Sequence, residues 1–474
     1  MATERRTLRA LLAAASLLLG GCLSSSIAAD LADVRARTHV PVLADVADLT
    51  VDPGSDDDAR DLLAEPLDAD AAVRLALLNN RALRAQLREL GVARGRLIQA
   101  RQVANPTFEA ESLPERNTAF EFRVEYDLTS LVLAPLRAKA AAADLQAARL
   151  DVAGDVVQLG YAVRSAFYTL QGAEQRLAIA QRALDTFAAS RDAAAALLEA
   201  GSISALDASS QIAAFEKARV TVAQIELEVA DQRERLQRLL GLHGQDTEWT
   251  IRGELPPVPD TTAITDGPET RVVQASLELA AMRSRLEAIA RRTKLSRTQG
   301  WLPEIDVDVH ALYGDPESTT TGGPVRAGAG VSLSVPLFNQ QRGTTRAHEA
   351  EFDALMERYH GLAIDLRSAA RETRNRVTSA YARARQFQQV ILPAQRRVVD
   401  ETQLQYNAMQ LGVFQLLQAR REQLDVELAY VDTLREFWSA SAALDTLLAG
   451  HRVDIVGAAD TTQMNAGSEP AGGH

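Results

Sequence analysis

The stretch IDVDVHALY at residues 305–313 alternates apolar and polar side chains along its length. Side chains that alternate with a period of two lie on opposite faces of a β-strand, so one face here would be apolar and the other ionic. Three more segments, near 107–113, 119–128 and 325–335, follow the same pattern. We therefore expect four strands, with the quoted one near 303–313, that pair as one β-hairpin in each half of the chain.

The polar faces of these segments carry most of the candidate functional residues, namely Glu109, Glu111, Glu121, Arg123, Glu125, Asp127, Asp306, Asp308, His310 and Arg326. Seven acids against two arginines leave this set with a net charge of −5. If the set lines a pore, its charge favours cations; the alternative is a wet face whose charges serve only solvation. Asp306, Asp308 and His310 lie about 6.8 Å apart per step, too far to share one ion with bonds of about 2 Å. No metal site and no cofactor are predicted.

The rest of the chain has the residue spacing of helices, and its two halves repeat one order. Helical stretches at 69–103 and 271–299 precede the strands, and stretches at 129–200 and 340–411, each about 100 Å long, follow them. Each long stretch reaches a glycine, Gly201 or Gly412, predicted to end the helix in the left-handed region. The sequence predicts two tandem repeats, 69–241 and 269–450, of a long helical hairpin plus a β-hairpin, joined by a linker at 242–268. Pro393 would bend or break its helix.

The N-terminus has the pattern of a signal peptide at residues 1–21. Arg5, Arg6 and Arg9 precede an apolar run at 10–19 that is too short to span a bilayer. The order LGGC at 19–22 resembles a bacterial lipobox, which makes Cys22 a candidate lipid anchor. A lipid-anchored extended linker at 22–68 and a disordered tail at 451–474 complete the expected organisation.

The composition excludes several classes of function. A net charge of −12 removes the basic surface that a nucleic-acid binder needs. The single cysteine excludes a disulfide within the chain, and no catalytic fingerprint predicts an enzyme.

The strands suit either a soluble sheet over a core or a membrane barrel with lipid outside. The signal peptide, the lipobox and the acidic polar face favour the membrane. No later segment is long and apolar enough for a transmembrane helix, so strands would have to span. Four strands cannot close a barrel, which needs about eight. Identical chains would therefore share one, and three chains would supply twelve strands.

Residues 69–450 resemble the TolC-like outer-membrane efflux proteins. The resemblance rests on the duplicated order, on Asn105-Pro106, on Leu302-Pro303, on VPLF at 335–338 and on the hairpin glycines. It implies a homotrimer with a twelve-stranded barrel in the outer membrane of a Gram-negative bacterium. It also implies an α-helical tunnel whose tip meets a periplasmic adaptor and an inner-membrane pump.

Two stretches, ANPTFEAE at 104–111 and QYNAM at 405–409, look more like the CzcC-like or copper-tolerance-associated branch, which exports heavy metals. The function expected is passive conduction of heavy-metal cations such as copper. A duct for drugs or other small molecules, or a non-conducting coiled-coil envelope lipoprotein, stays open.

Members of this family carry acidic residues just after the second hairpin glycine, where they ring a closed aperture. Here Gln415 and Gln418 stand near those positions, which puts an acidic ring in doubt, while Asp207 keeps an acid in the first repeat. Phe414 is a candidate constriction or, alternatively, a packing residue between hairpins.

Overall fold

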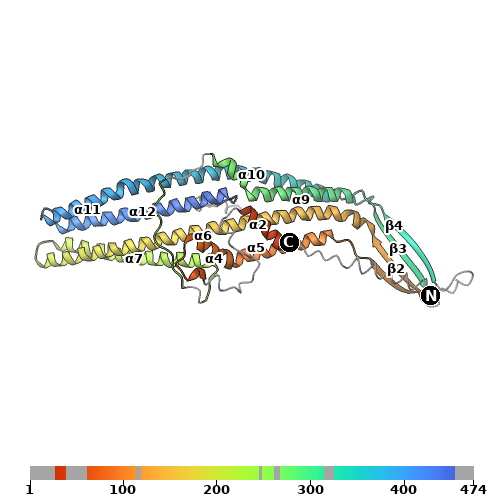
Figure 1. Ribbon diagram of the computed structural model, residues 1–474, viewed down its shortest axis with the longest axis horizontal. Coiled ribbons are helices and arrows are strands. Elements are labelled where there is room, and N and C mark those ends of the chain that lie inside the picture. The colour runs from red at the N-terminus through yellow and green to blue at the C-terminus, as the bar shows by residue number, and fades with distance from the viewer. Residues whose placement is uncertain are drawn as a thin grey trace, which may run out of the picture.

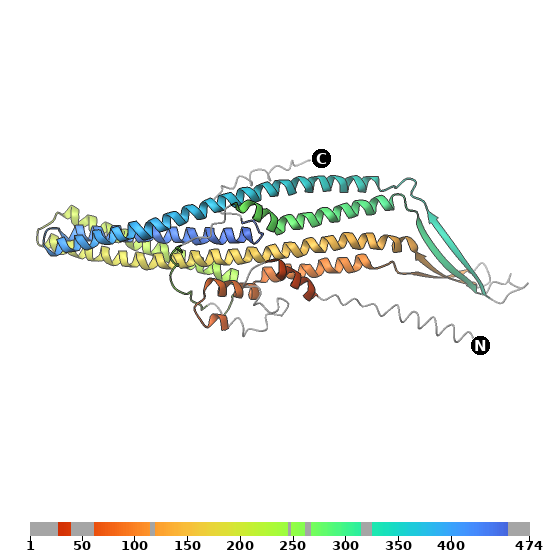
Figure 2. The same cartoon turned by 45° about the horizontal axis from the view of Figure 1, so that its top comes forward.

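The computed structural model describes residues 27–38, 61–113, 119–244, 248–260, 267–313 and 325–453. They form an elongated body with a small sheet at one end and the tips of two helical hairpins at the other (Figure 1). The turned view in Figure 2 keeps this arrangement. The predicted signal peptide at 1–21, the candidate anchor Cys22 and residues 454–474 lie outside the described residues. Within the described ranges, the structure has no helix that is long and apolar enough to span a membrane.

The two halves of the chain repeat one order of elements. The first half contains α4 (Ala69–Asn79), α5 (Arg81–Arg101), β1 (Thr107–Leu113), β2 (Ala119–Asp127), α6 (Leu128–Glu199) and α7 (Ala205–Leu240). The second contains α8 (Pro268–Ala275), α9 (Leu277–Gln299), β3 (Glu304–Tyr313), β4 (Val325–Ser334), α10 (Arg342–Gln386), α11 (Leu392–Asn407) and α12 (Val413–Leu448). The predicted fold class, mainly α with a small β part in two repeats, is confirmed.

The four strands form one antiparallel sheet in the order β1-β2-β3-β4. The pairing of β2 with β3 joins the two halves of the chain. One row of residues across all four strands is apolar: Phe108, Val124, Val309 and Ala329. The neighbouring row is Glu109, Arg123, His310 and Gly328. Because successive residues face opposite sides, the sheet has one apolar and one polar face.

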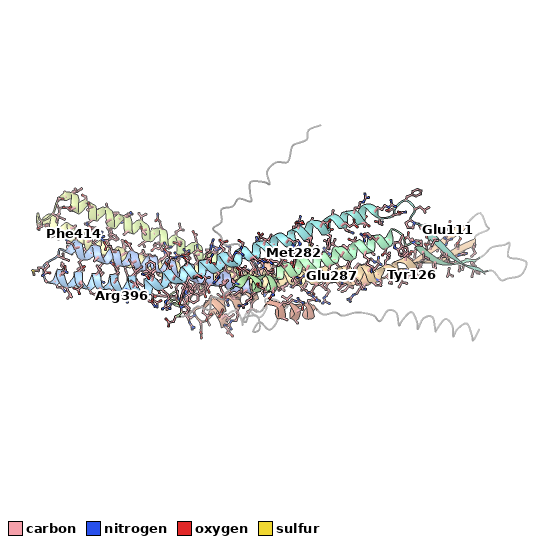
Figure 3. All side chains as sticks on the ribbon, turned by 90° about the horizontal axis from the view of Figure 1, so that it is seen from above. Glu111, Tyr126, Met282, Glu287, Arg396 and Phe414 are labelled. Carbon is pink, nitrogen blue, oxygen red and sulfur yellow. The ribbon has the colours of Figure 1, made fainter. Side chains whose placement is uncertain are left out.

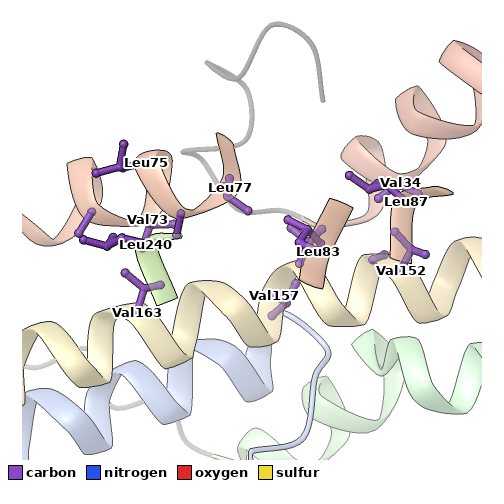
Figure 4. Close-up of a cluster of buried hydrophobic side chains, with 14 of the residues drawn as sticks. Val34, Val73, Leu75, Leu77, Leu83, Leu87, Val152, Val157, Val163 and Leu240 are labelled. Atoms are coloured by element: carbon purple, nitrogen blue, oxygen red, sulfur yellow. The ribbon is translucent and has the colours of Figure 1, made fainter. Parts of the chain in front are cut away.

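The helices form a layer beside one another. Helix α6 contacts α5 and α7 along one flank and α9 and α12 along the other, and α10 contacts α9 and α12 in turn (Figure 1). The layer therefore has two free edges within one chain, one formed by α5 and α7 and the other by α10 and α11. Its core contains Val73, Leu83, Val157 and Leu240, which lie where α4, α5, α6 and α7 meet (Figure 4).

The helical stretches predicted at 69–103 and 271–299 are each broken once, which corrects the prediction. Asn80 separates α4 from α5, and its side chain accepts a hydrogen bond from Leu83 N at 3.0 Å. Ser276 separates α8 from α9 and caps Leu279 N at 3.1 Å. Side-chain oxygens that satisfy the first N–H groups of a helix favour a new start, so these polar residues begin new helices.

The breaks allow half-length helices to stack end to end. Helix α7 ends at Gly241, in the left-handed region at φ 71°, directly against Asn79, the last residue of α4, and next to Asn80, which caps α5. Helix α12 ends near Gly450, also left-handed, and the carbonyl of Gly450 accepts a bond from Leu277 N of α9 at 2.8 Å. We call these two junctions the seams. At each seam a negative helix C-terminus faces a positive N-terminus, which is the favourable orientation.

The long helices run the length of the layer. Helix α6 has 72 residues, about 108 Å at 1.5 Å per residue. In the second half, α10 continues into α11 through a π-helical turn at Phe387–Ile391, and Pro393 is the second residue after this turn. Pro393 therefore neither ends the helix nor introduces a loop, and the helix instead widens locally into a π turn. The wider turn accommodates a residue that lacks an N–H group.

The segment predicted as an extended linker at 22–68 contains a helix, α2 (Ile27–Thr38), which packs on α6. Its Asp30 is fully buried and pairs with Arg94 of α5 and Arg149 of α6. A buried carboxylate is tolerated when it is paired, and two guanidinium groups supply that pairing. The extended prediction missed α2 because its partners lie 64 and 119 residues away.

The predicted inter-repeat linker is also packed. Its residues 248–260, here called the strap, cross the layer from α7 to α10. Side chains of four helices donate hydrogen bonds to strap carbonyls in succession: Arg233 to Trp249, Gln171 to Arg252, Trp438 to Pro256 and Tyr381 to Asp260. The side chains of its own Trp249, Leu255 and Val258 are buried. The strap therefore ties the four helix columns together across one face.

Candidate functional site

The polar face of the sheet unites the ten residues predicted for it. The register places Glu109 opposite Arg123 and Glu111 opposite Glu121. It also places Glu125 opposite Asp308 and Asp127 opposite Asp306. His310 lies opposite Arg123, and Arg326 lies opposite Leu312, the neighbour of Glu121 on that face. Residues opposite one another in an antiparallel pair share a face, so the alternation in sequence placed this set correctly.

Two short-range pairs order the charges on this face. Arg123 Nη2 lies 3.0 Å from Glu121 Oε1, and His310 Nδ1 lies 2.9 Å from Asp308 Oδ2. Ser332 also donates a bond of 3.3 Å to Asp306. The structure groups no three His, Cys, Asp or Glu side chains around a possible metal ion anywhere in its described part. The face is a charged surface on which Asp308 and His310 pair with each other and Glu121 pairs with Arg123.

Two glycines of β4 make room on the polar face, a feature that the sequence analysis missed. Gly328 lies opposite His310 and Gly330 opposite Asp308. A Cβ at either position would collide with the facing side chain, at 2.8 Å from His310 Cε1 and 3.0 Å from Asp308 Cγ. The imidazole and the carboxylate therefore lie across the bare backbone of β4. The signal was present in the sequence as Gly at every second position of AGAGV, residues 327–331.

The other face of the sheet exposes large apolar side chains. Phe108 is 74 % exposed and Val331 is 72 % exposed. The remainder of this surface is Phe120, Phe122, Val124, Val309, Tyr313 and Leu333. A contiguous apolar surface of this kind marks contact with lipid or protein. The sheet thus has one apolar face and one ionic face, which is the pattern of a membrane-spanning strand.

Asp127 has a second role at the junction between sheet and helix. Its carboxylate caps α6 by accepting a bond from Ser130 N at 3.0 Å. Next to it, Thr129 Oγ1 accepts a bond of 2.7 Å from Ile305 N of β3. These bonds fix the direction in which the long helix leaves the sheet.

The hairpin tips lie at the far end from the sheet, as the positions of Phe414 and Glu111 in Figure 3 show. Gly201 follows α6 in the left-handed region at φ 70°, as predicted. The prediction for Gly412 is wrong, because it has φ −82° and is the N-cap of α12. The left-handed position in the second hairpin belongs to Met409, at φ 59°.

The same backbone hydrogen bonds close both tips. Ser202 N bonds to Leu197 O at 2.8 Å, and Gln410 N bonds to Gln405 O at 2.9 Å. This pattern defines the end of a helix, so Met409 corresponds to Gly201. No sequence signal marks a methionine for this position, and aligning the two glycines therefore misplaced the second turn.

Asp207 stabilises the start of α7. Its carboxylate accepts bonds from the Ser204 hydroxyl at 2.7 Å and from Ser204 N at 3.2 Å, while Ser204 Oγ accepts a bond from Asp207 N. This capping box lowers the pKa of Asp207, chiefly through the hydroxyl hydrogen bond. The acid predicted for the tip is therefore bound locally.

The equivalent residues of the second tip differ. Gln415 occupies the third position of α12, and its side chain lies over Gly412. Gln418 donates a bond of 2.9 Å to Glu422 on its own helix. Phe414 is half-buried within one chain. The second tip therefore presents amides where the first presents a carboxylate.

The family model for the outer membrane efflux protein matches residues 133–242 and 271–450, which is more than half of the chain. The chain belongs to the outer membrane efflux protein family. The two matched ranges cover the two helical hairpins, α6 with α7 and α10 to α12, one in each half of the chain. The resemblance to TolC-like proteins is thereby confirmed.

Individual relatives agree with the family. The cobalt-zinc-cadmium resistance protein CzcC of Cupriavidus metallidurans is 25 % identical over 400 residues, which cover 81 % of this chain and 90 % of that protein. The Campylobacter jejuni CmeC outer membrane channel superposes with a TM-score of 0.68 at 14 % identity, covering 81 % of this chain and 86 % of the other. A membrane protein from Pseudomonas aeruginosa gives 0.68 at 19 % identity, covering 80 % and 92 %.

Membership of the outer membrane efflux protein family fixes the class of activity. Proteins of this family are channels of the Gram-negative outer membrane, so the chain is an efflux channel and not an enzyme. The two-faced sheet and the long helical layer are the parts of the chain from which such a channel is built. The family does not assign a role to individual residues of the sheet or the tips.

Proposed function

We propose that three copies of this chain close a shared twelve-stranded barrel and a helical tunnel, and that the channel passively conducts heavy-metal cations to the exterior. A periplasmic adaptor and an inner-membrane pump would deliver the cations to the tips. The observation that carries the proposal is the sheet, which joins an exposed apolar face to an acidic one but has only four strands among the residues that the structure describes. Such a sheet is complete only when other copies continue it.

The edges of the helical layer support closure by further copies. The free edge of α7 exposes Ile212, Val220 and Leu227, each more than half exposed. The opposite edge exposes Val390, Val398 and Leu404 on the π turn and α11. Apolar side chains on both free edges would be buried if α10 and α11 of one copy packed on α5 and α7 of the next.

The charge on the polar face supports cations as the substrate class. The ten predicted residues alone would place fifteen net negative charges on the inner face of the barrel in three copies, since they contribute −5 per copy. The name of the relative CzcC refers to cobalt, zinc and cadmium. Divalent heavy-metal cations therefore suit both the lumen charge and the relative.

Anchoring by an acylated Cys22 belongs to the same proposal. Two acyl chains on this residue, with the signal peptide 1–21 removed, would hold the N-terminus at the inner leaflet of the outer membrane. Mass spectrometry of the purified N-terminal peptide tests this, with a Cys22→Ser variant as control.

The test is conductance of the detergent-purified trimer in planar bilayers. The wild type should migrate as a trimer and prefer cations over anions. Asp306→Lys should lower that preference, while the control Glu65→Lys, beside the strap and far from the sheet, should leave it unchanged. A monomer without conductance would support the coiled-coil envelope lipoprotein instead. Equal effects of the two substitutions would remove the acidic-lumen argument.

A further inference from the structure

A cavity of about 920 Å³ lies within the helical layer, between α6, α7, α9, α10, α12 and residues 451–453. Part of its wall lies on sides of α6 and α12 that are turned away from the strap. On α6 it is lined by Thr169, two residues or about 200° around the helix from Gln171, which bonds to the strap. On α12 it is lined by Glu436, which is likewise two residues, or about 200° around the helix, from Trp438, which bonds to the strap. We call this cavity the groove.

The charges lining the groove do not balance. Four arginines line it, Arg235, Arg376, Arg435 and Arg452, against the acids Glu278 and Glu436. This is a formal charge of +2 in a chain whose net charge is −12.

Both acids already have partners. Glu436 pairs with Arg383 at 2.7 Å, and Glu278 accepts a bond from Arg452 N at 3.1 Å. Arg376 pairs with Glu372 at 2.7 Å, and Arg452 pairs with Asp365 at 3.4 Å. Two guanidinium groups are left, those of Arg235 and Arg435. Throughout the described part of the chain, neither has a hydrogen bond or an ion pair with another residue.

Arg435 is held in place although it lacks a polar partner. The stem of its side chain lies over Gly172 of α6, with Cδ 3.4 Å and Cβ 3.5 Å from the position that a Cβ there would take. Its Nε is buried and unbonded. Thr373, from α10, lines the same groove, is fully buried, and has a hydroxyl without a partner among the described residues. Buried donors without acceptors are unfavourable, so this wall is suited to a group that brings acceptors.

We propose that the groove binds a small polyanion, with two or more carboxylate or phosphate groups. Guanidinium groups bind such groups through paired, charge-assisted hydrogen bonds, and the volume is that of a small-molecule site. The inner helices α6 and α12 form more than half of the wall, and the helices of the free edges contribute fewer residues, Arg235 from α7 and Leu362, Thr373 and Arg376 from α10. A free anion is therefore the occupant, and not a side chain of a second copy. The proposal goes beyond conduction and does not depend on it.

Isothermal titration calorimetry of the full detergent-purified protein with citrate, and separately with pyrophosphate, tests this at constant ionic strength. Both probes should bind saturably. Arg435→Gln and Arg235→Gln should each weaken binding by about tenfold or more, as expected for a hydrogen bond to a charged group. The affinity of Arg435→Lys should lie between those of the wild type and Arg435→Gln, because lysine keeps the positive charge but lacks the two-pronged guanidinium donor.

The matched control is Arg385→Gln, because Arg385 bonds to the strap at Asp260 on the other face. Its affinity should equal that of the wild type. Absence of saturable binding, or equal loss in Arg385→Gln and Arg435→Gln, would overturn the proposal. Binding by monomers that disappears in the trimer would also overturn it, since a neighbouring copy would then fill the groove.

Discussion

Replacing Gly241 by alanine should open the seam where α7 meets α5. The residue combines a left-handed backbone with close contact, since a Cβ would lie 2.6 Å from the carbonyl oxygen of Asn79 and 2.8 Å from its carbon. Gly201 has nearly the same φ, 70° against 71°, but open space around it. Gly201→Ala therefore measures the conformational part alone, and the difference between the variants measures the contact.

The expected magnitudes follow from these distances. An L-residue in the left-handed region costs about 1 kcal/mol relative to glycine, and this applies to both variants. At Gly241 the backbone of Asn79 must also move, which breaks the bond of 2.9 Å from Asn80 Nδ2 to Leu239 O. That bond and the partial exposure of the fully buried Leu240 add about 2 kcal/mol. The total is about 3 kcal/mol, or about two orders of magnitude in local opening.

Hydrogen exchange of the native protein, read by mass spectrometry, measures this opening. Peptides covering residues 76–84 and 236–244 should exchange about a hundredfold faster in Gly241→Ala, whereas Gly201→Ala should affect the tip by less than about tenfold. Equal acceleration at both sites would refute the view that contact at the seam, and not backbone conformation, makes Gly241 necessary.

Three further predictions concern the tips and the sheet. The pKa of Asp207 is lowered in the folded protein, so the capping box is fully stabilising above the ordinary pKa of 3.8 and is lost as the pH falls through the folded pKa. Hydrogen exchange at residues 202–208 should therefore accelerate in acid. Asp207→Asn should remove this dependence on pH. Met409→Gly should slow exchange at its tip by up to about fivefold because it relieves the left-handed strain, while Met409→Ala should not. Gly328→Ala should displace His310 and lower the yield of heat-stable trimer on gels, and Ala327→Gly serves as the control on the apolar face.

The sheet was predictable from the sequence because its information is local. Alternation over nine or ten residues fixes which side chains share a face, and pairing then needs only the order of the strands. Length and duplication likewise indicate the long helices. In contrast, the tip of the second hairpin was misplaced, because Met409 adopts a glycine conformation that only the surrounding turn imposes.

Features that depend on distant partners were not predictable. Nothing in the sequence around Asp30 distinguishes it from a surface aspartate, and its burial is favourable only because the fold brings Arg94 and Arg149 into contact with it. The groove is formed by residues from 158 to 453, and nothing near Arg435 in the sequence indicates that its guanidinium lacks a partner. Composition alone pointed to an acidic molecule and concealed this basic site.

The strap has a consequence for how the protein can vary. Most of its bonds to the four helices use its own main-chain carbonyls, which every amino acid possesses, while the donors are particular side chains such as Gln171 and Trp438. The side chain of Glu254, which accepts a bond from Gln175, is an exception. The residue types at the donor positions on the helices are therefore constrained, whereas the residue types of the strap at the accepting carbonyls are not. Related chains should therefore exchange the exposed side chains of the strap freely, provided that its length and the donors facing it are retained.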